Sequence, residues 1–220
     1  SAKYISSLES YGVIPSDISS FNNLKVILST GSTLSNESYD YVYTYWKKDV
    51  QLSSISGGTD IISCFALGNP TLPVRRGELQ CRGLGMSVES YSDDGKPVFN
   101  EQGELVCTRA FPSMPVYFWN DPDGQKFINA YFNIFKNTWT HGDYIQINSN
   151  GGVQIYGRSD ATLNPGGVRI GTAEIYDVVE GIDKVIDSVV VGYSNKSDEV
   201  IVLFVKLDKN TKLDSNLKDE

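Results

Sequence analysis

The fold of this chain is decided by residues 24–58, which read LKVILSTGSTLSNESYDYVYTYWKKDVQLSSISGG. The apolar run Leu24–Leu28 is typical of a short buried strand, and the small residues that follow it predict a loop. Four large residues between positions 39 and 46 then recur at i, i+3, i+4 and i+7, which is the spacing of one apolar helix face. A second strand is expected over Val50–Ser56. A strand, a helix and a second strand in this order indicate the end of an α/β layer.

The composition changes at Pro70. From there to about Gly157, short strand candidates alternate with glycine, proline and Asn/Asp pairs, and the segment Asn148–Gly152 predicts a hairpin turn. This spacing favours a small antiparallel barrel or sandwich, interrupted by one helix near Gln125–Phe135.

A third region begins near Arg158. Thr172 is placed to cap a helix, and two strongly apolar runs, Ser188–Val191 and Val200–Val205, are expected to pack as neighbouring strands under it. The sequence therefore predicts an α+β protein: the end of an α/β layer, a small antiparallel β-barrel-like subdomain, and a small C-terminal α+β domain. The three regions cover residues 1–69, 70–157 and 158–220.

Charge and composition argue against several classes of function. The chain has 19 basic and 27 acidic residues and a net charge of −8, which does not favour binding to nucleic acid or to anionic lipid. No run approaches the roughly 20 apolar residues of a membrane span, and the N-terminus lacks signal-peptide features, so we expect a cytoplasmic protein without a membrane partner. The three cysteines are odd in number and far apart, which favours a reduced compartment. A single histidine without a Cys/His cluster argues against zinc.

The first candidate site is Ser56–Asp60, with the sequence SGGTD. Its two glycines allow the backbone to approach a ligand closely. The hydroxyl of Thr59 and the carboxylate of Asp60 suit a hard cation that bridges phosphates. An ordinary tight turn, in which the aspartate accepts a local hydrogen bond, explains the same residues.

The other candidates contain further charged residues. Asp143, in THGD directly before a strand, can accept two hydrogen bonds from a vicinal diol such as that of ribose, although Gly-Asp is also an ordinary turn. The neighbouring His141 has no nucleophile motif beside it and is interpreted as structural. Residues 157–171, GRSDATLNPGGVRIG, place Arg158 and Arg169 eleven positions apart around a Gly/Pro-rich loop, and arginine pairs bidentately with phosphate. A surface hairpin with solvated charges is the alternative for that segment.

The loop Ser29–Thr33 is rich in small residues and superficially resembles half of a phosphate-binding loop. It is followed by Leu34 and Ser35 in place of the glycine and lysine that such a loop requires. We therefore do not interpret it as a phosphate loop.

In their order, these motifs resemble the adenylate-forming superfamily of acyl-CoA synthetases, and within it the branch that activates acetoacetate. The resemblance rests on GGTD, Gly-Glu-Leu, HGD, GRSD and RIGTAEI, and it runs from about Leu24 to about Leu207. It implies an acid–thiol ligase in which a carboxylate attacks the α-phosphate of ATP with Mg²⁺, and coenzyme A then displaces AMP to form a thioester. The expected partners are small molecules: ATP, acetoacetate or a similar short acyl acid, and coenzyme A.

The resemblance assigns the nucleotide to four positions. Gly31 and Ser32 would lie against adenine, and Asp143 and Arg158 would hold the ribose. A glutamate or an alanine often stands where this chain has Ser32, which puts the detail of the adenine contact in doubt.

The resemblance also assigns the reacting end of the site. Thr59 would contact phosphate, Asp60 would assist Mg²⁺, and Arg169 would reach a phosphate from the loop before the helix that contains Glu174. The superfamily usually has glutamate where Asp60 stands, so the metal contact is expected to be adjusted or to run through water. Asp160 would be the hinge between a large and a small domain.

Two family elements are not found in the sequence. The phosphate loop with its lysine is expected upstream of Ser1, and the lysine that engages the carboxylate is expected downstream of Glu220. We therefore expect residues 1–69 to end the large domain's α/β subdomain, 70–157 to be its β-rich subdomain, and 158–220 to be the hinge with an incomplete small domain. Such a fragment is expected to be inactive alone.

A non-enzymatic, β-rich binding module for peptides or sugars is the competing interpretation. The 13 tyrosines and the glycine-rich β segments are compatible with it, since aromatic residues are common at binding faces. The ordered motifs argue against it, because such a module does not need two arginines beside a hinge-like loop. A nucleotide-binding titration distinguishes the two.

Overall fold

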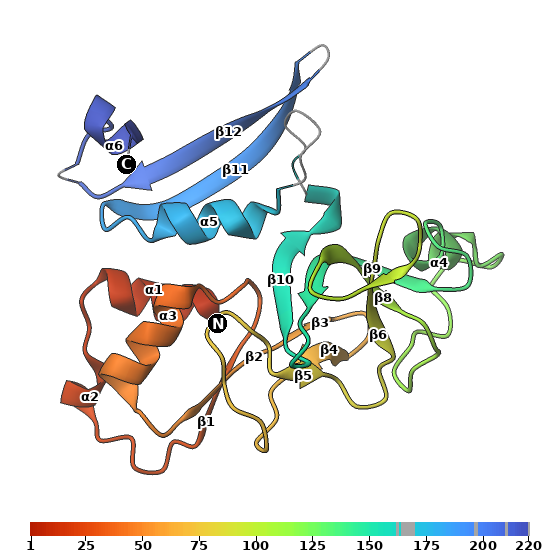
Figure 1. The fold of residues 1–220 in the computed structure, drawn as a ribbon, viewed down its shortest axis with the longest axis horizontal. Helices are drawn as coiled ribbons and strands as arrows, with labels where there is room; N and C mark the ends of the chain where they lie inside the picture. Colours follow the sequence, from red (N-terminus) through yellow and green to blue (C-terminus); the bar gives the residue numbers. More distant parts are fainter. Residues whose placement is uncertain (162, 164–169, 196–197, 210, 220) are drawn as a thin grey trace.

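A computed structural model describes residues 1–161, 163, 170–195, 198–209 and 211–219 of the chain. Three parts follow one another (Figure 1): helices on two strands, a β-rich part beside them, and a helix with a two-stranded ribbon that lies above the N-terminal helices. Among the helices of the described ranges, none is long and apolar enough to cross a membrane.

The first part contains the predicted strand–helix–strand unit. Its two strands pair in parallel over four residue pairs, and the connection between them is helical. Ser35 caps this helix, as predicted, because its hydroxyl accepts the N–H of Ser38 at 3.3 Å. The elements are α1 (Ala2–Ser10), α2 (Pro15–Ile18), β1 (Val26–Ser29), α3 (Asn36–Tyr41), a π-helical turn (Val42–Trp46) and β2 (Gln51–Ser54).

The β-rich part consists of two antiparallel sheets. One has the strand order β3-β4-β5 and the other β10-β9-β8-β6-β7. The predicted α+β fold class is confirmed, and neither described sheet closes into a barrel. The strands are β3 (Ser56–Gly58), β4 (Ser63–Leu67), β5 (Cys81–Arg82), β6 (Val88–Tyr91), β7 (Pro97–Val98), β8 (Gln102–Cys107), β9 (Trp139–Ile147) and β10 (Val153–Arg158).

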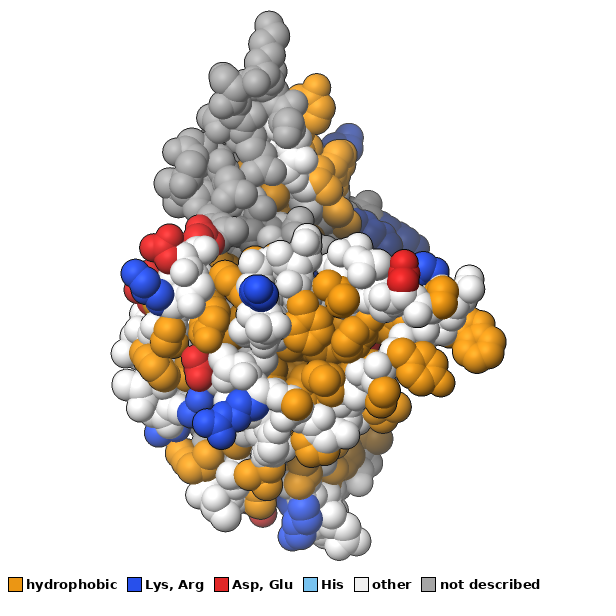
Figure 2. Space-filling view, turned by 90° about the vertical axis from the view of Figure 1, so that its right-hand side faces the viewer, with side chains coloured by type: hydrophobic (Ala, Val, Ile, Leu, Met, Phe, Trp, Pro, Cys, Tyr) orange, Lys and Arg blue, Asp and Glu red, His pale blue; other side chains and the backbone are white. Residues whose placement is uncertain are grey.

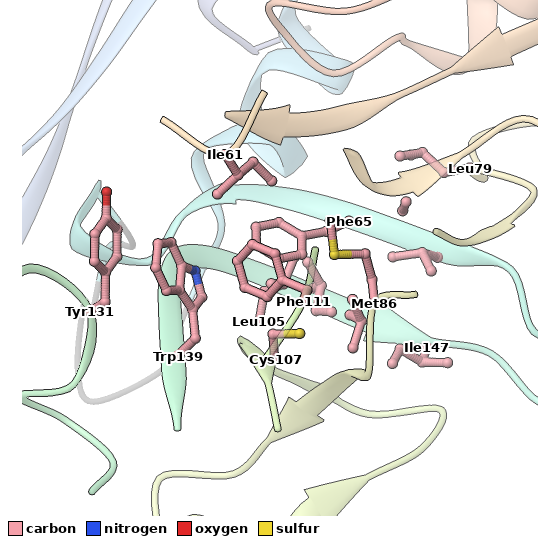
Figure 3. Packing of buried hydrophobic residues seen from close by; sticks show 14 residues of the cluster. Ile61, Phe65, Leu79, Met86, Leu105, Cys107, Phe111, Tyr131, Trp139 and Ile147 are labelled. Carbon is pink, nitrogen blue, oxygen red and sulfur yellow. The ribbon is translucent and has the colours of Figure 1, made fainter. Parts of the chain in front are cut away.

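One hydrophobic core connects the two sheets with the predicted helix, which is α4 (Gln125–Tyr131). Fourteen buried side chains form this core, and Figure 3 shows Trp139 and Tyr131 at one end of it. Trp139, at the start of β9, is 1% exposed, and its ring stacks on that of Tyr131 with 3.5 Å between centroids and 14° between planes. Buried aromatic pairs stabilise a fold beyond their area alone, so this stack ties α4 to β9.

Not all large apolar side chains are buried. Val116, Tyr117 and Trp119, in the loop before α4, are well exposed. Figure 2 shows hydrophobic side chains gathered on the face at the right of Figure 1, which is the side where α4 lies.

The third part is the predicted helix on two strands. β11 and β12 pair antiparallel, and Tyr176 of α5 accepts the N–H of Val190 at 3.2 Å. The helix is capped differently from the prediction: Thr172 is its first residue, and the N–H of the preceding Gly171 is bound by the carboxylate of Glu174 at 2.8 Å. The elements are a 3₁₀ turn (Ser159–Ala161), α5 (Thr172–Glu180), β11 (Val185–Asn195), β12 (Asp198–Leu207) and α6 (Ser215–Asp219).

Candidate functional site

A cleft of about 810 Å³ opens where the three parts meet. It is lined by the loop after β1, by the β3 segment, by the facing stretches of β9 and β10, and by the first turns of α5. A smaller cavity of about 550 Å³ lies between α3 and the C-terminal end of α5, and none of the predicted site residues that the structure describes lines it. The larger cleft is therefore the candidate site.

Most of the predicted site residues line this cleft. These are Gly31, Ser32, Thr59, Asp143, Arg158 and Glu174. Asp60 stands next to the lining residue Thr59, and Asp160 lies in the 3₁₀ turn that follows β10. Arg169 and most of its loop lie outside the described residues. The functions assigned to all of these site residues stay predictions.

The His-Gly-Asp segment enters the cleft because β9 is irregular there. On the β8 side, Glu104 pairs with Tyr144 and Val106 pairs with Thr140, so three residues of β9 face one residue of β8. On the other side, the register shifts between Ile155 and Gly157 of β10. Bulges of this kind re-aim side chains and are common beside active sites. Here residues 141–143 bulge away from the pairing with β8, while Asp143 stays paired with Arg158 of β10.

Asp143 and Arg158 meet across the β9–β10 pairing, and we call residues 141–143 together with Arg158 the β9–β10 corner. Arg158 Nη1 donates to Asp143 Oδ1 at 3.2 Å and to the carbonyl oxygen of His141 at 3.1 Å. A Cβ on Gly142, where φ is +81°, would lie 2.5 Å from Arg158 Nη2, so glycine is required for the guanidinium to pack there. The aspartate side chain is 12% exposed, with the charge of Arg158 beside it.

Glu104 supports this corner and had no role in the sequence prediction. Its Oε1 accepts the N–H of Gly142 at 2.9 Å, and the Ser159 side chain also hydrogen-bonds to it. Burial raises the pKa of this carboxyl group, and the charge of Asp143 raises it further. The sequence signal for Glu104 was its position in a Gly-Glu-Leu motif, where an acidic residue stands between residues typical of a strand.

His141 is buried against the wall of the cleft. Its ring lies 4.7 Å from that of Phe65, and Nε2 is 3.9 Å from Asp143 Oδ2. Nδ1 is buried and has no hydrogen-bond partner among the residues that the structure describes. Burial lowers the pKa of the imidazole, so it is uncharged at neutral pH. A neutral, packed ring fits the interpretation of His141 as structural.

Asp60 is held by a residue far away in the sequence. Its Oδ2 accepts a hydrogen bond from the Tyr131 hydroxyl at 2.6 Å. Its Oδ1 lies over Gly58, where an added Cβ would be 2.0 Å from it and 3.1 Å from His141 Cε1. One carboxylate oxygen therefore lies beside two residues of the cleft wall, while the other faces the aromatic core.

The comparisons with known proteins agree on one relationship. No protein-family model matches the chain. The acetoacetyl-coenzyme A synthetase of Rhizobium meliloti (strain 1021) is 55% identical over 220 residues, which cover 100% of this chain and 34% of that protein. The solved acetoacetyl-CoA synthetase from Streptomyces lividans has a TM-score of 0.88 and 40% identity, covering 100% of this chain and 33% of its own. An anthranilate CoA ligase solved with anthranoyl-AMP shares the fold, with a TM-score of 0.78 at 17% identity over 99% of this chain and 40% of its own.

By fold, the chain is similar to solved acyl-CoA synthetases and ligases. By sequence, it is related over its whole length to acetoacetyl-CoA synthetases, so the predicted resemblance is confirmed. The chain spans about a third of the length of these relatives.

Proposed function

We propose that this chain is the nucleotide-binding part of an ATP-dependent acid–thiol ligase. The ligase would activate acetoacetate, or a similar short acyl acid, as an acyl-adenylate and transfer it to coenzyme A in the cytoplasm. The observation that carries the proposal is the Asp143–Arg158 pair in a cleft that Gly31 and Ser32 also line. The similarity to acetoacetyl-CoA synthetases supports the choice of acyl acid.

The base and the ribose of the nucleotide would contact different described residues of the cleft. Gly31 has φ +95° and open space beside its Cα, so a planar base could pack on its backbone next to Ser32. Asp143 would accept hydrogen bonds from the ribose hydroxyls through Oδ2, while Arg158 holds Oδ1. This arrangement would orient the α-phosphate toward Thr59.

The carboxylate substrate would attack the α-phosphorus with loss of pyrophosphate. The thiol of coenzyme A would then displace AMP from the acyl carbon. In both steps negative charge moves onto oxygens that Thr59 could meet with its hydroxyl and Arg169 with its guanidinium, so these two residues would stabilise the departing group. Glu174, on the first turn of α5, is bound to the Gly171 N–H and would fix the start of that helix beside the cleft.

Mg²⁺ fits the donors that the described residues of this region offer. Mg²⁺ is usually held by one or two carboxylates together with substrate phosphates and water. Within the described residues, no group of three or more His, Cys, Asp or Glu could hold a metal ion, and Asp60 offers Oδ1 beside Gly58. This set suits a cation that arrives with ATP, and bound Mg²⁺ would neutralise charge on the phosphates.

The C-terminal part would move between the two half-reactions. Residues 158–220 would then be the small domain, and residues 1–69 and 70–157 the two subdomains of the large one. Asp160 is the proposed pivot, because the 3₁₀ turn Ser159–Ala161 follows the last strand of the five-stranded sheet. Hinges absorb their dihedral changes at a few such positions at the ends of elements.

The test is a titration of the folded chain with AMP, in which binding is measured by fluorescence or calorimetry. Asp143→Ala should weaken AMP binding at least about tenfold, because up to two charge-assisted hydrogen bonds of about 1.5–3 kcal/mol each are lost. Asp94→Ala is the matched control, since Asp94 is an exposed acid in the turn between β6 and β7. A folded chain that binds no adenine nucleotide would favour the binding module, and equal affinities of the two variants would leave Asp143 as a turn residue.

A further inference from the structure

The Tyr131–Asp60 hydrogen bond joins α4 to the turn that follows β3, across 71 positions of sequence. At 2.6 Å it lies in the range of O–H···O⁻ bonds to an ionised acceptor. Burial raises the pKa of the Tyr131 hydroxyl, and its bond to Asp60 and that carboxylate's charge raise it further. The hydroxyl therefore stays protonated and acts as the donor.

The tyrosine that makes this bond is itself fixed. Its ring stacks on Trp139 at 3.5 Å between centroids, and the rings of Phe118 and Phe127 make T-shaped contacts with it at 5.6 Å and 5.5 Å. Trp139 begins β9, the strand that carries Asp143. The hydroxyl consequently has a defined position relative to the β9–β10 corner, and it transmits that position to Asp60.

The bond leaves the two carboxylate oxygens of Asp60 unequal. Oδ2 is occupied by Tyr131, whereas Oδ1 lies over Gly58 and beside His141, both of which line the cleft. In a carboxylate held in this way, Oδ1 is the oxygen left for a cation, and the hydrogen bond to Oδ2 disfavours chelation with both oxygens. Monodentate ligation suits Mg²⁺, which keeps several waters and demands regular octahedral geometry.

We propose that Tyr131 is a positioning residue that holds Asp60 so that only Oδ1 meets the cation–phosphate group of bound ATP. The proposal rests on the proposed function. It adds that the metal-side and ribose-side carboxylates, Asp60 and Asp143, are set relative to each other through the Tyr131–Trp139 stack. Tyr131 itself touches neither nucleotide nor metal.

The experiment compares ATP with AMP, because AMP lacks the phosphates that a cation would bridge. Tyr131→Phe keeps the stacked ring and removes only the hydroxyl. In the purified chain it should raise the Mg²⁺ concentration for half-maximal ATP binding by about threefold to tenfold and leave AMP affinity unchanged. Tyr117→Phe is the matched control, since Tyr117 is 71% exposed in the loop before α4, and it should change neither quantity.

Asp60→Asn gives the second arm. It should weaken Mg²⁺-dependent ATP binding selectively, and adding Tyr131→Phe to it should have little further effect, because the two residues act as one unit. Equal weakening of ATP and AMP by Tyr131→Phe, no change in either, or full additivity with Asp60→Asn would each overturn the inference. If the wild-type chain binds AMP but Tyr131→Phe behaves as wild type, only this inference fails. If the folded wild-type chain binds neither nucleotide, the proposed function fails and takes the inference with it.

Discussion

Strand β9 and the C-terminal part of the chain differ in how they are held. β9 pairs with β8 on one side and β10 on the other, and its first residue, Trp139, is packed in the aromatic core. Among the described residues, the C-terminal part is joined through the short 3₁₀ turn, the start of α5 on β10, an exposed Lys3–Asp187 ion pair, and an interface that contains a cavity of about 550 Å³. The nucleotide-binding corner is thus built on fixed elements, and the part proposed to move rests on contacts that can be exchanged.

The largest expected effect concerns the fixed side. Trp139→Ala should lower the free energy of unfolding by about 3–5 kcal/mol, because it removes a buried ring and leaves a cavity under β9. Urea unfolding measures this. Trp119→Ala, at a position that is 90% exposed, should stay within about 0.5 kcal/mol of wild type. Similar losses in the two variants would contradict the fixed core at β9.

The next effect concerns the proposed pivot, in the complete ligase. Asp160→Pro would hold φ near −65° and remove an N–H, so rotation about residue 160 would be restricted. One half-reaction should fall roughly tenfold more than the other. Pyrophosphate exchange measures the adenylation step. Thioester formation from pre-made adenylate measures the second step. Equal losses in a folded variant would place the pivot elsewhere.

Acidity should also affect the interface between α3 and α5. Burial is the largest of the causes that raise the pKa of Asp177 from 3.8 to about 6. The charges of Glu37 and Glu180 also raise this pKa, and the charge of Arg76 lowers it. Folding therefore favours the protonated acid: this stabilisation is complete below pH about 3.8 and is lost as pH rises through about 6. Asp177→Asn should flatten the pH dependence of the unfolding free energy in this window. Asp183→Asn, beyond the same helix, should leave the pH dependence of the unfolding free energy unchanged. If this variant flattens the pH dependence equally, the cause is the overall negative charge of the region and not Asp177.

The smallest expected effect is that of the ion pair between the parts. Lys3 Nζ lies 2.8 Å from Asp187 Oδ1, with side chains 56% and 49% exposed. A double-mutant cycle over Lys3→Ala and Asp187→Ala should give a coupling of about 0.2–1 kcal/mol, as for other exposed pairs. A much larger coupling would show that this interface is held more firmly than its exposure indicates.

The elements that sequence predicted best are those with a local signal. The layer of residues 24–54 followed from an apolar run, a helical spacing and the cap at Ser35, each of which depends on neighbours in sequence. α5 was also predicted, but its cap was assigned to Thr172 instead of Gly171. The reason is local competition: the carboxylate of Glu174 binds the Gly171 N–H, so Gly171 is the N-cap and the helix starts one residue earlier than predicted.

The candidate site was predicted in its residue types and not in its geometry. Motif order placed Asp143 and Arg158 together, and the structure brings them to 3.2 Å. The hydrogen bonds of Glu104 to residue 142 and of Tyr131 to Asp60 could not be predicted, because they join strands and a helix that are 38 and 71 positions apart. Such contacts depend on strand register, which a single sequence does not specify at a bulge.

The three-residue excursion of β9 opposite one residue of β8 has a consequence for how the length of this chain can vary. Because side chains alternate between sheet faces, losing one residue between Thr140 and Tyr144 would turn every preceding or following side chain of β9 to the wrong face. The deletion would turn the buried Trp139, or the buried side chains of the rest of β9, away from the core and turn their polar neighbours into it. The exposed turn between β6 and β7 carries no such constraint, so homologous chains should differ in length there and keep the residue count of β9 constant.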